Sequence, residues 1–397
     1  MNEVEETLRR TFGQAADQAP RLPALLPERL ERVHRRRRRR TRVALATAAV
    51  VLIAGGTVAV VRGGDTTTAV PAAQSFSAKP AAPVEEVWPQ AVEKIPAKGP
   101  GDRPWRAAAL IDDRTAMMVA STADAGTAEA VYAYDLDKGV HREIATMPEP
   151  ESGHGFAGGF TVGNGHVAWW SGTKERVAKL WTVPVSGGEP KLVGSQSIKE
   201  GDGSGIDELA IAGDQIVFSL YTGGVFTVPL AGGTVTPVEK GAGMHLLAWP
   251  WIGTPGQGGE PHGTAYARIQ NVETGETRTS VTQPGENVRI CGVTICLGRT
   301  AQGEGFFRHR DGSGYKAVAG QVAMMNPPTQ DRFYPSAYGD GMPAGVGLYD
   351  LDTGASGDLG IRADGQPIPI PTTDPTGRLL SYPLGDQLYL IDLARIR

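Results

Sequence analysis

The sequence contains only two cysteines in 397 residues, and it lacks the short motifs that identify several common enzyme classes. There is no His-Glu-x-x-His pair for a zinc protease, no Gly-x-Ser-x-Gly nucleophile elbow and no Gly-x4-Gly-Lys-Ser/Thr phosphate loop. These absences exclude enzymes that depend on one of these local motifs. A catalytic site assembled from residues far apart in the sequence is still possible. We therefore predict no catalytic residue, no metal and no cofactor, and we favour a non-enzymatic protein.

Positive charge is scarce outside the N-terminal region. Residues 1–62 hold 13 Lys+Arg against 6 Asp+Glu, whereas the remainder holds 26 against 37. Because binding to nucleic acid requires positive surface to neutralise phosphates, the acidic remainder argues against such a partner.

One uninterrupted apolar run, residues 43–61, is free of charge and proline. A bilayer core of about 30 Å needs about 20 helical residues, so this run is just long enough to cross it. The arginines at 35–40 directly before it indicate a cytoplasmic N-terminus and an extracytoplasmic C-terminal part of a plasma-membrane protein. The alternatives are a cleaved export signal, for which residues 1–42 are unusually long, and a buried helix of a soluble protein.

The segments on either side of this run differ in texture. Residues 1–42 contain two short amphipathic patterns broken by prolines, which predict two helices that dock on a cytoplasmic regulatory protein or lie on the inner leaflet. The alternative is a poorly ordered basic tail. Residues 62–104 are rich in Ala, Pro and Thr, which is typical of an extended stalk.

From residue 105 onward, short β-type runs recur with a regular spacing. Each repeat has an alternating apolar strand that ends at a marker residue, and the marker residues are separated by 49, 45, 42, 37, 42 and 42 positions. The markers are Asp135, Pro184, Pro229, Asn271, Arg308, Asp350 and Asp392. A period near 43 is typical of four-stranded propeller blades. The sequence therefore predicts an all-β propeller over 105–397, with seven blades favoured and six as the alternative.

Turns and edges support this interpretation. Gly163-Asn164-Gly165, Gly213-Asp214 and Asp374-Pro375-Thr376-Gly377 each precede a strand, as expected for tight antiparallel connections. The last repeat ends close to the C-terminus without an outer strand. We expect residues 90–96 to supply that strand, because an unpaired edge invites aggregation.

These repeats resemble those of WD-repeat and TolB-like β-propellers, and DPTGRLLSY followed by LYLIDL is similar to the core of a TolB-like blade. The resemblance covers residues 105–397 and implies architecture alone, since the Trp-Asp dipeptide of WD repeats is absent. The single-pass layout also resembles actinobacterial envelope proteins, some of which accompany extracytoplasmic-function sigma factors. The His-x3-Cys-x2-Cys pattern of zinc anti-sigma domains is absent here.

Cys291 and Cys296 are separated by four residues that suit a hairpin turn. In an extracytoplasmic domain this pair is expected to form a disulfide that joins the first two strands of the fifth blade. A metal site is the alternative, but no second Cys or His pair lies nearby. His154 and His245 fall in loop-like stretches and are candidates for the central channel, although single histidines are more often structural.

Two aromatic sites are dense. Trp169 and Trp170 alternate along one strand, so at least one is expected to pack between blades. Trp249 and Trp251 fall in a Pro/Gly-rich stretch, 248–261, that we expect to be a loop. Loop tryptophans can form a contact hot spot, but packing between blades is the default expectation.

Two Asp-Leu-Asp sequences, beginning at Asp135 and Asp350, resemble the start of a calcium loop but lack its later ligands. We expect their first aspartates to bind the turns that follow.

The sequence as a whole favours a membrane-anchored binding or sensing module whose propeller face takes a protein, small-molecule or glycan ligand. The alternatives are an envelope lyase or hydrolase acting in the propeller channel, and a passive scaffold. Convergence of polar residues with shifted pKa values in one channel pocket would favour the enzyme.

Overall fold

The computed structural model describes residues 79–80, 82–122, 127–148, 156–173, 175–198, 205–257, 263–318, 326–339, 343–363 and 368–397. All of them belong to the unit Val70–Arg397. No helix among them is long and apolar enough to cross a membrane. The predicted tail (1–42), the predicted span (43–61) and His154 lie outside the described residues.

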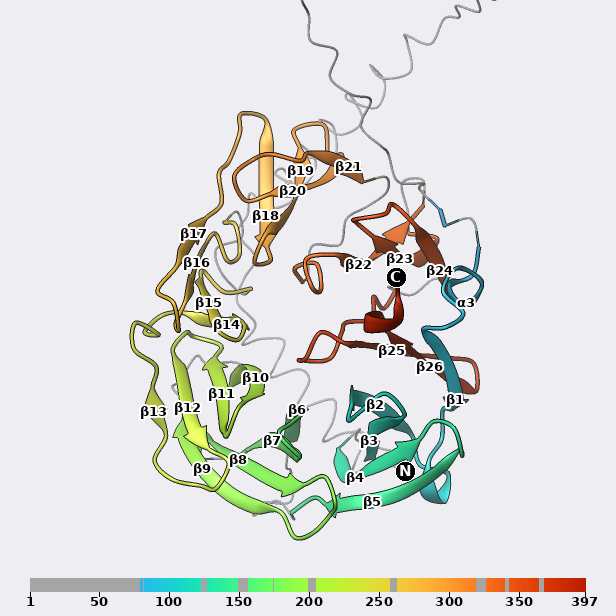
Figure 1. Ribbon diagram of the computed structural model, residues 1–397, viewed down its shortest axis with the longest axis vertical. Helices are drawn as coiled ribbons and strands as arrows, with labels where there is room; N and C mark the ends of the chain where they lie inside the picture. The colour runs from blue at the N-terminus through green and yellow to red at the C-terminus, as the bar shows by residue number, and fades with distance from the viewer. Residues whose placement is uncertain are drawn as a thin grey trace, which may run out of the picture. The chain divides into compact units, whose positions relative to one another are not determined.

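Seven small antiparallel sheets form a ring in chain order (Figure 1). The first three, each of four strands, are β2 (Trp105–Leu110), β3 (Thr115–Ser121), β4 (Ala128–Asp135) and β5 (Val140–Thr146); β6 (Phe156–Gly163), β7 (His166–Gly172), β8 (Val177–Pro184) and β9 (Lys191–Ser197); and β10 (Ile206–Ala212), β11 (Gln215–Leu220), β12 (Val225–Pro229) and β13 (Thr236–Pro237). The predicted seven-bladed propeller is confirmed, and the six-bladed alternative is excluded.

The fourth and fifth blades also have four strands, and the last two blades have three. The strands are β14 (His245–Ala248), β15 (Trp251–Thr254), β16 (Arg268–Asn271) and β17 (Thr277–Thr279); β18 (Glu286–Cys291), β19 (Ile295–Thr300), β20 (Gly305–His309) and β21 (Lys316–Val318); β22 (Phe333–Tyr338), β23 (Gly345–Asp350) and β24 (Ser356–Arg362); and β25 (Leu379–Leu384), β26 (Gln387–Asp392) and β1 (Val92–Pro96). The short helices are α3 (Val84–Val87), η1 (Pro100–Asp102) and η2 (Leu393–Arg395).

Apolar side chains pack between neighbouring blades because each strand presents one side chain in two to either face of its sheet. Trp169 joins the cluster between blades one and two, and Trp170 joins the cluster between blades two and three. Both side chains are buried. The expectation that at least one of them packs between blades is confirmed, and here both do.

The segment before the first blade closes the ring. β1 pairs antiparallel with β26, from Val92 opposite Ile391 to Pro96 opposite Gln387. Just upstream, Val84 and Trp88 are buried against the sixth and seventh blades. The stalk predicted over 62–104 therefore does not extend through residues 82–96, because this part carries apolar side chains that pack on the propeller.

The turns follow the chemistry of their residues. Asn164 and Gly165 connect β6 to β7 with φ of 45° and 71°, values that Asn and Gly adopt readily. The Asp135 carboxylate accepts hydrogen bonds from the amides of Asp137 and Lys138. The Asp350 carboxylate accepts from the amides of Asp352 and Thr353 in the same way. These contacts confirm the predicted turn role of both aspartates.

Cys291 and Cys296 form a disulfide between β18 and β19, where they are directly opposed with Cα atoms 4.0 Å apart. Both are fully buried together with Val288 and Phe306. The predicted pairing within the fifth blade is confirmed.

Candidate functional site

A proline-rich segment stands where the innermost strand of the seventh blade would run. Residues 368–374 precede β25 but make a single bridge to it, between Thr373 and Leu380. Pro369 and Pro371 have no N–H to donate, so neither can contribute a backbone hydrogen bond to a ladder with β25. We call residues 368–375 the strap. The loop that connects it to β25 reaches toward the centre of the ring (Figure 1).

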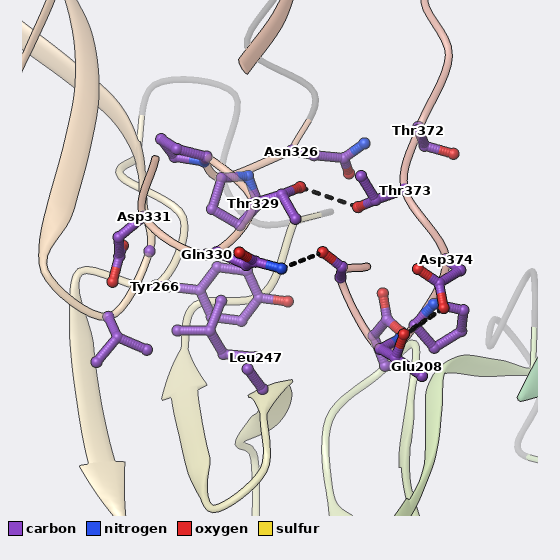
Figure 2. Close-up of a pocket in the computed structure, with 18 of the residues that line it drawn as sticks. Glu208, Leu247, Tyr266, Asn326, Thr329, Gln330, Asp331, Thr372, Thr373 and Asp374 are labelled. Carbon is purple, nitrogen blue, oxygen red and sulfur yellow. Dashed lines mark hydrogen bonds between the residues drawn. The ribbon is translucent and has the colours of Figure 1, made fainter. Parts of the chain in front are cut away.

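A cavity of about 330 Å³ lies between the strap, the loop before β22 and the blades three to five (Figure 2). Polar side chains on its wall include Glu208, Tyr266, Asn326, Thr329, Gln330 and Thr372. They come from positions far apart in the sequence, and the ring brings them together. We call this space the Glu208 cavity.

Hydrogen bonds hold the two loops of the Glu208 cavity to each other. The hydroxyls of Thr329 and Thr373 are 2.9 Å apart, and the Gln330 amide donates to the Gly377 carbonyl at 2.9 Å. The Asp331 carboxylate accepts from the amides of Thr294 and Ile295 at 2.9 and 3.1 Å, which ties the same loop to the fifth blade. The wall is thus pre-organised.

The turn that ends the strap is built by Asp374. One of its carboxylate oxygens accepts from the amides of Arg378 and Leu379, at 2.8 and 2.6 Å. The other accepts from the hydroxyl of Thr376. Burial nevertheless raises the pKa of this carboxyl. The turn predicted over Asp374 to Gly377 is present, with Gly377 at a φ of 72°.

The carboxyl of Glu208 is strongly perturbed in the Glu208 cavity. It follows a register shift in β10 between Ile206 and Glu208. Burial, together with the neighbouring charge of Asp207, raises the pKa of Glu208 to about 7, and the hydrogen bond of the Leu209 amide offsets this only in part. Across the described ranges, no Lys, Arg or His forms an ion pair with Glu208.

The Asp207 carboxylate is held by the side chains of His245 and Ser219, and it also accepts from the Glu208 amide at 2.9 Å. The Nδ1 atom of His245 lies 2.6 Å from one carboxylate oxygen, and the hydroxyl of Ser219 donates to the other. The Ser219 oxygen accepts from the Leu246 amide at 2.9 Å. The carboxylate therefore stands between serine and histidine, so the hydroxyl proton points to Asp207 and the imidazole cannot activate Ser219 as it would in a catalytic triad.

His245, predicted as a channel candidate, is buried at the start of β14 and is absent from the wall of the Glu208 cavity. It packs against Gly256, where an added Cβ would lie 2.5 Å from its Nδ1 atom. His245 orients Asp207, and the negative charge of Asp207 in turn helps to raise the pKa of Glu208.

Tyr266 lies beside Glu208 and is buried. Its hydroxyl donates to the Leu246 carbonyl at 3.3 Å. Burial and the charges of Asp207 and Glu208 raise the pKa of Tyr266, so its hydroxyl stays protonated and keeps this hydrogen bond.

No protein-family model and no curated protein matches the sequence. Solved structures are similar in fold. An oligogalacturonate lyase from Vibrio parahaemolyticus is 11% identical, with 76% of this chain and 96% of that chain covered at a TM-score of 0.46. YCF48 from Cyanidioschyzon merolae is 8% identical over 76% and 99% at 0.43. The WD40 β-propeller domain of Doa1 is 8% identical over 74% and 99% at 0.39. At these identities the likeness concerns the fold alone.

The two loop tryptophans do not reach the Glu208 cavity wall. Trp249 and Pro250 form a tight turn between β14 and β15, and Trp249 packs against the cluster between blades three and four. Trp251 begins β15, and the guanidinium of Arg278 lies 4.6 Å from its ring centroid. The expectation of one continuous loop over 248–261 is wrong, because β15 occupies Trp251–Thr254.

Sequence reasoning missed Glu208, Tyr266 and the strap. One signal for Glu208 was available: the adjacent pair Asp207-Glu208 interrupts an otherwise apolar strand. An ionisable pair at the start of an inner strand is a candidate channel group. Tyr266 carried no comparable signal, because nothing in its local sequence distinguishes it from a core tyrosine.

Proposed function

We propose that this protein is a non-enzymatic binding or sensing module that holds its ligand in the Glu208 cavity of the propeller. One observation carries the proposal. A pre-organised polar wall surrounds a carboxyl that has no cationic partner among the described residues. Ligand pockets typically enclose about 300–1,000 Å³ and are fixed by a few polar groups, and this cavity is at the lower end of that range.

The chemistry of the wall favours a hydrogen-bonding group that carries positive charge. Glu208 would accept from it, and the amide side chains of Asn326 and Gln330 would orient its hydroxyls or amides. A cation beside Glu208 would favour the ionised carboxylate and so repay its unfavourable burial. An amino sugar or a lysine side chain has this chemistry, in keeping with a glycan or protein ligand.

Binding to the full-length protein tests this proposal. Glucosamine is titrated against wild type and Glu208→Gln, with glucose as the uncharged comparison and Glu93→Gln as the control variant, since Glu93 is exposed on β1. We expect wild type to bind glucosamine about tenfold more tightly than glucose. Glu208→Gln should bind the two sugars equally. A preference that survives in Glu208→Gln, or the same loss in Glu93→Gln, would contradict the proposal.

For the rest of the chain we propose a plasma-membrane anchor at residues 43–61 and a cytoplasmic tail that contacts a regulatory protein such as a sigma factor. The apolar run and the arginines before it motivate this proposal. An affinity pull-down from native membranes compares the full chain with a version lacking residues 2–34. Recovery of a cytoplasmic regulator by the full chain alone is the expected result; identical partners for both versions would restrict the function to the propeller.

An enzyme in the same channel is the second candidate, because a carboxyl with a pKa of about 7 suits a general acid or base at neutral pH. Incubation with oligosaccharides followed by mass spectrometry separates the two candidates. Cleavage that is lost in Glu208→Gln would establish the enzyme, whereas intact substrate that remains bound would favour the binding module.

A further inference from the structure

A second and larger cavity of about 770 Å³ lies on another side of the strap. Its wall is formed by β2, β6, the end of β24, the blade-seven hairpin and the strap itself, so it shares Thr372 to Pro375 with the Glu208 cavity. Most of the wall is apolar, with Phe160, Ile370 and the strap prolines among its members. We call this space the Arg106 cavity.

Arg106 projects from β2 as the one described guanidinium on this wall that has no ion pair. Its contact is aromatic, with the guanidinium carbon 5.4 Å from the centroid of the Phe160 ring. Arg106 is exposed, so a ligand can reach its side chain, and desolvation by the surrounding protein lowers the pKa of its guanidinium with no carboxylate to counter this. Arginine is nonetheless protonated at neutral pH, so the cavity holds a positive charge.

The other charged groups on the wall are already occupied. Both terminal nitrogens of Arg362 donate to the Asp358 carboxylate, each at 2.8 Å. Asp374 accepts from the amides of Arg378 and Leu379 at the end of the strap. Arg106 is therefore left as one guanidinium fork that faces a largely apolar space.

We propose that the Arg106 cavity binds a monocarboxylate with an apolar body. A guanidinium presents two parallel N–H donors that match the two oxygens of one planar carboxylate. The apolar wall of Phe160, Ile370 and the prolines would cover the body of such a ligand. A phosphate dianion fits less well, because it needs a second cation and Arg362 is already paired to Asp358.

Matched acids and amides test this site in the full-length protein. 3-Phenylpropanoate, cyclohexanecarboxylate and hexanoate are compared with their amides by saturation-transfer NMR and thermal shift, at constant ionic strength. We expect at least one acid to bind about 10- to 100-fold more tightly than its amide, since charged hydrogen bonds to a guanidinium are strong. The proposal is overturned if no acid in the series is preferred over its amide.

Variants assign the preference to Arg106. Arg106→Gln is expected to abolish the preference for the acid, and Arg106→Lys, which keeps the charge but loses the fork, should retain only part of it. Arg114→Gln is the control, because Arg114 is exposed and pairs with Asp137 outside this cavity. Glu208→Gln should leave the preference for the acid intact. The carboxylate site at Arg106 can therefore be present even if the proposed function of the Glu208 cavity is wrong. A preference that persists in both Arg106 variants would refute the assignment.

Discussion

Replacing Glu208 by glutamine should stabilise the propeller, and the gain should depend on pH. The carboxyl of Glu208 is surrounded by protein and lies next to the charge of Asp207, and these two effects raise its pKa to about 7 from an ordinary value of 4.5. Glutamine has nearly the same shape and keeps a hydrogen-bonding oxygen, but it never carries the charge.

The sign of the effect follows from proton linkage. Below about pH 4.5 Glu208 is protonated in both the folded and the unfolded chain, so it does not contribute to the pH dependence. Between about pH 4.5 and 7 the unfolded chain loses this proton while the folded chain retains it, so stability falls as pH rises. Above pH 7 the penalty is constant. The pKa difference corresponds to about 3 kcal/mol, as an upper bound because water in the cavity screens the charge.

Thermal and urea unfolding of the full-length protein at pH 4.5, 6 and 8 measure this penalty. At pH 4.5 wild type and Glu208→Gln should unfold together. At pH 8 the variant should be more stable by up to about 3 kcal/mol, or roughly 5 °C for a domain of this size. Glu93→Gln, at an exposed position of β1, should show no such divergence. A Glu208→Gln curve parallel to wild type at every pH would refute the reasoning.

Three further changes probe other parts of the fold. Cys291→Ser should cost about 2 kcal/mol, because the disulfide closes a short loop, and a reductant should also lower the wild-type midpoint; an unchanged midpoint would contradict the pairing. Glu286→Gln should destabilise by about 3 kcal/mol in urea titrations, since it removes the counter-charge of the fully buried Arg308; a loss under about 1 kcal/mol would be inconsistent. Gly256→Ala should cost about 1–3 kcal/mol and shift the imidazole NMR signals of His245; unaltered signals would show that the two do not touch.

The repeat pattern allowed most of the architecture to be predicted. The period near 43 and the marker residues gave seven blades, because each marker lies in or at the end of a strand that the ring repeats. Turn chemistry was equally informative, since Asn164 and Gly165 adopt the positive φ that a tight hairpin needs. The two cysteines were placed correctly because they flank one such hairpin.

The candidate site was harder to predict because its members are local only in space. Glu208, Tyr266 and Gln330 lie in three different blades or their loops, and no spacing in the sequence relates them. His245 was selected for its residue type, but burial makes it a support for Asp207. The informative feature of the sequence was the presence of charged residues on an inner strand, as at Asp207 and Glu208.

The two cavities have a common structural origin in the seventh blade. A regular inner strand would pair along β25 and fill the space beside it, as side chains fill the interior of small closed sheets. The strap makes a single bridge to β25, between Thr373 and Leu380, so it does not continue the sheet, and it forms a wall for both cavities. The lost pairing is on the inner side of the blade, while β1 completes its outer edge. The ring therefore stays closed at its rim, while its centre departs from regular strand packing. The spaces that result are lined by Glu208 and Arg106, neither of which has an ion-pair partner among the described residues.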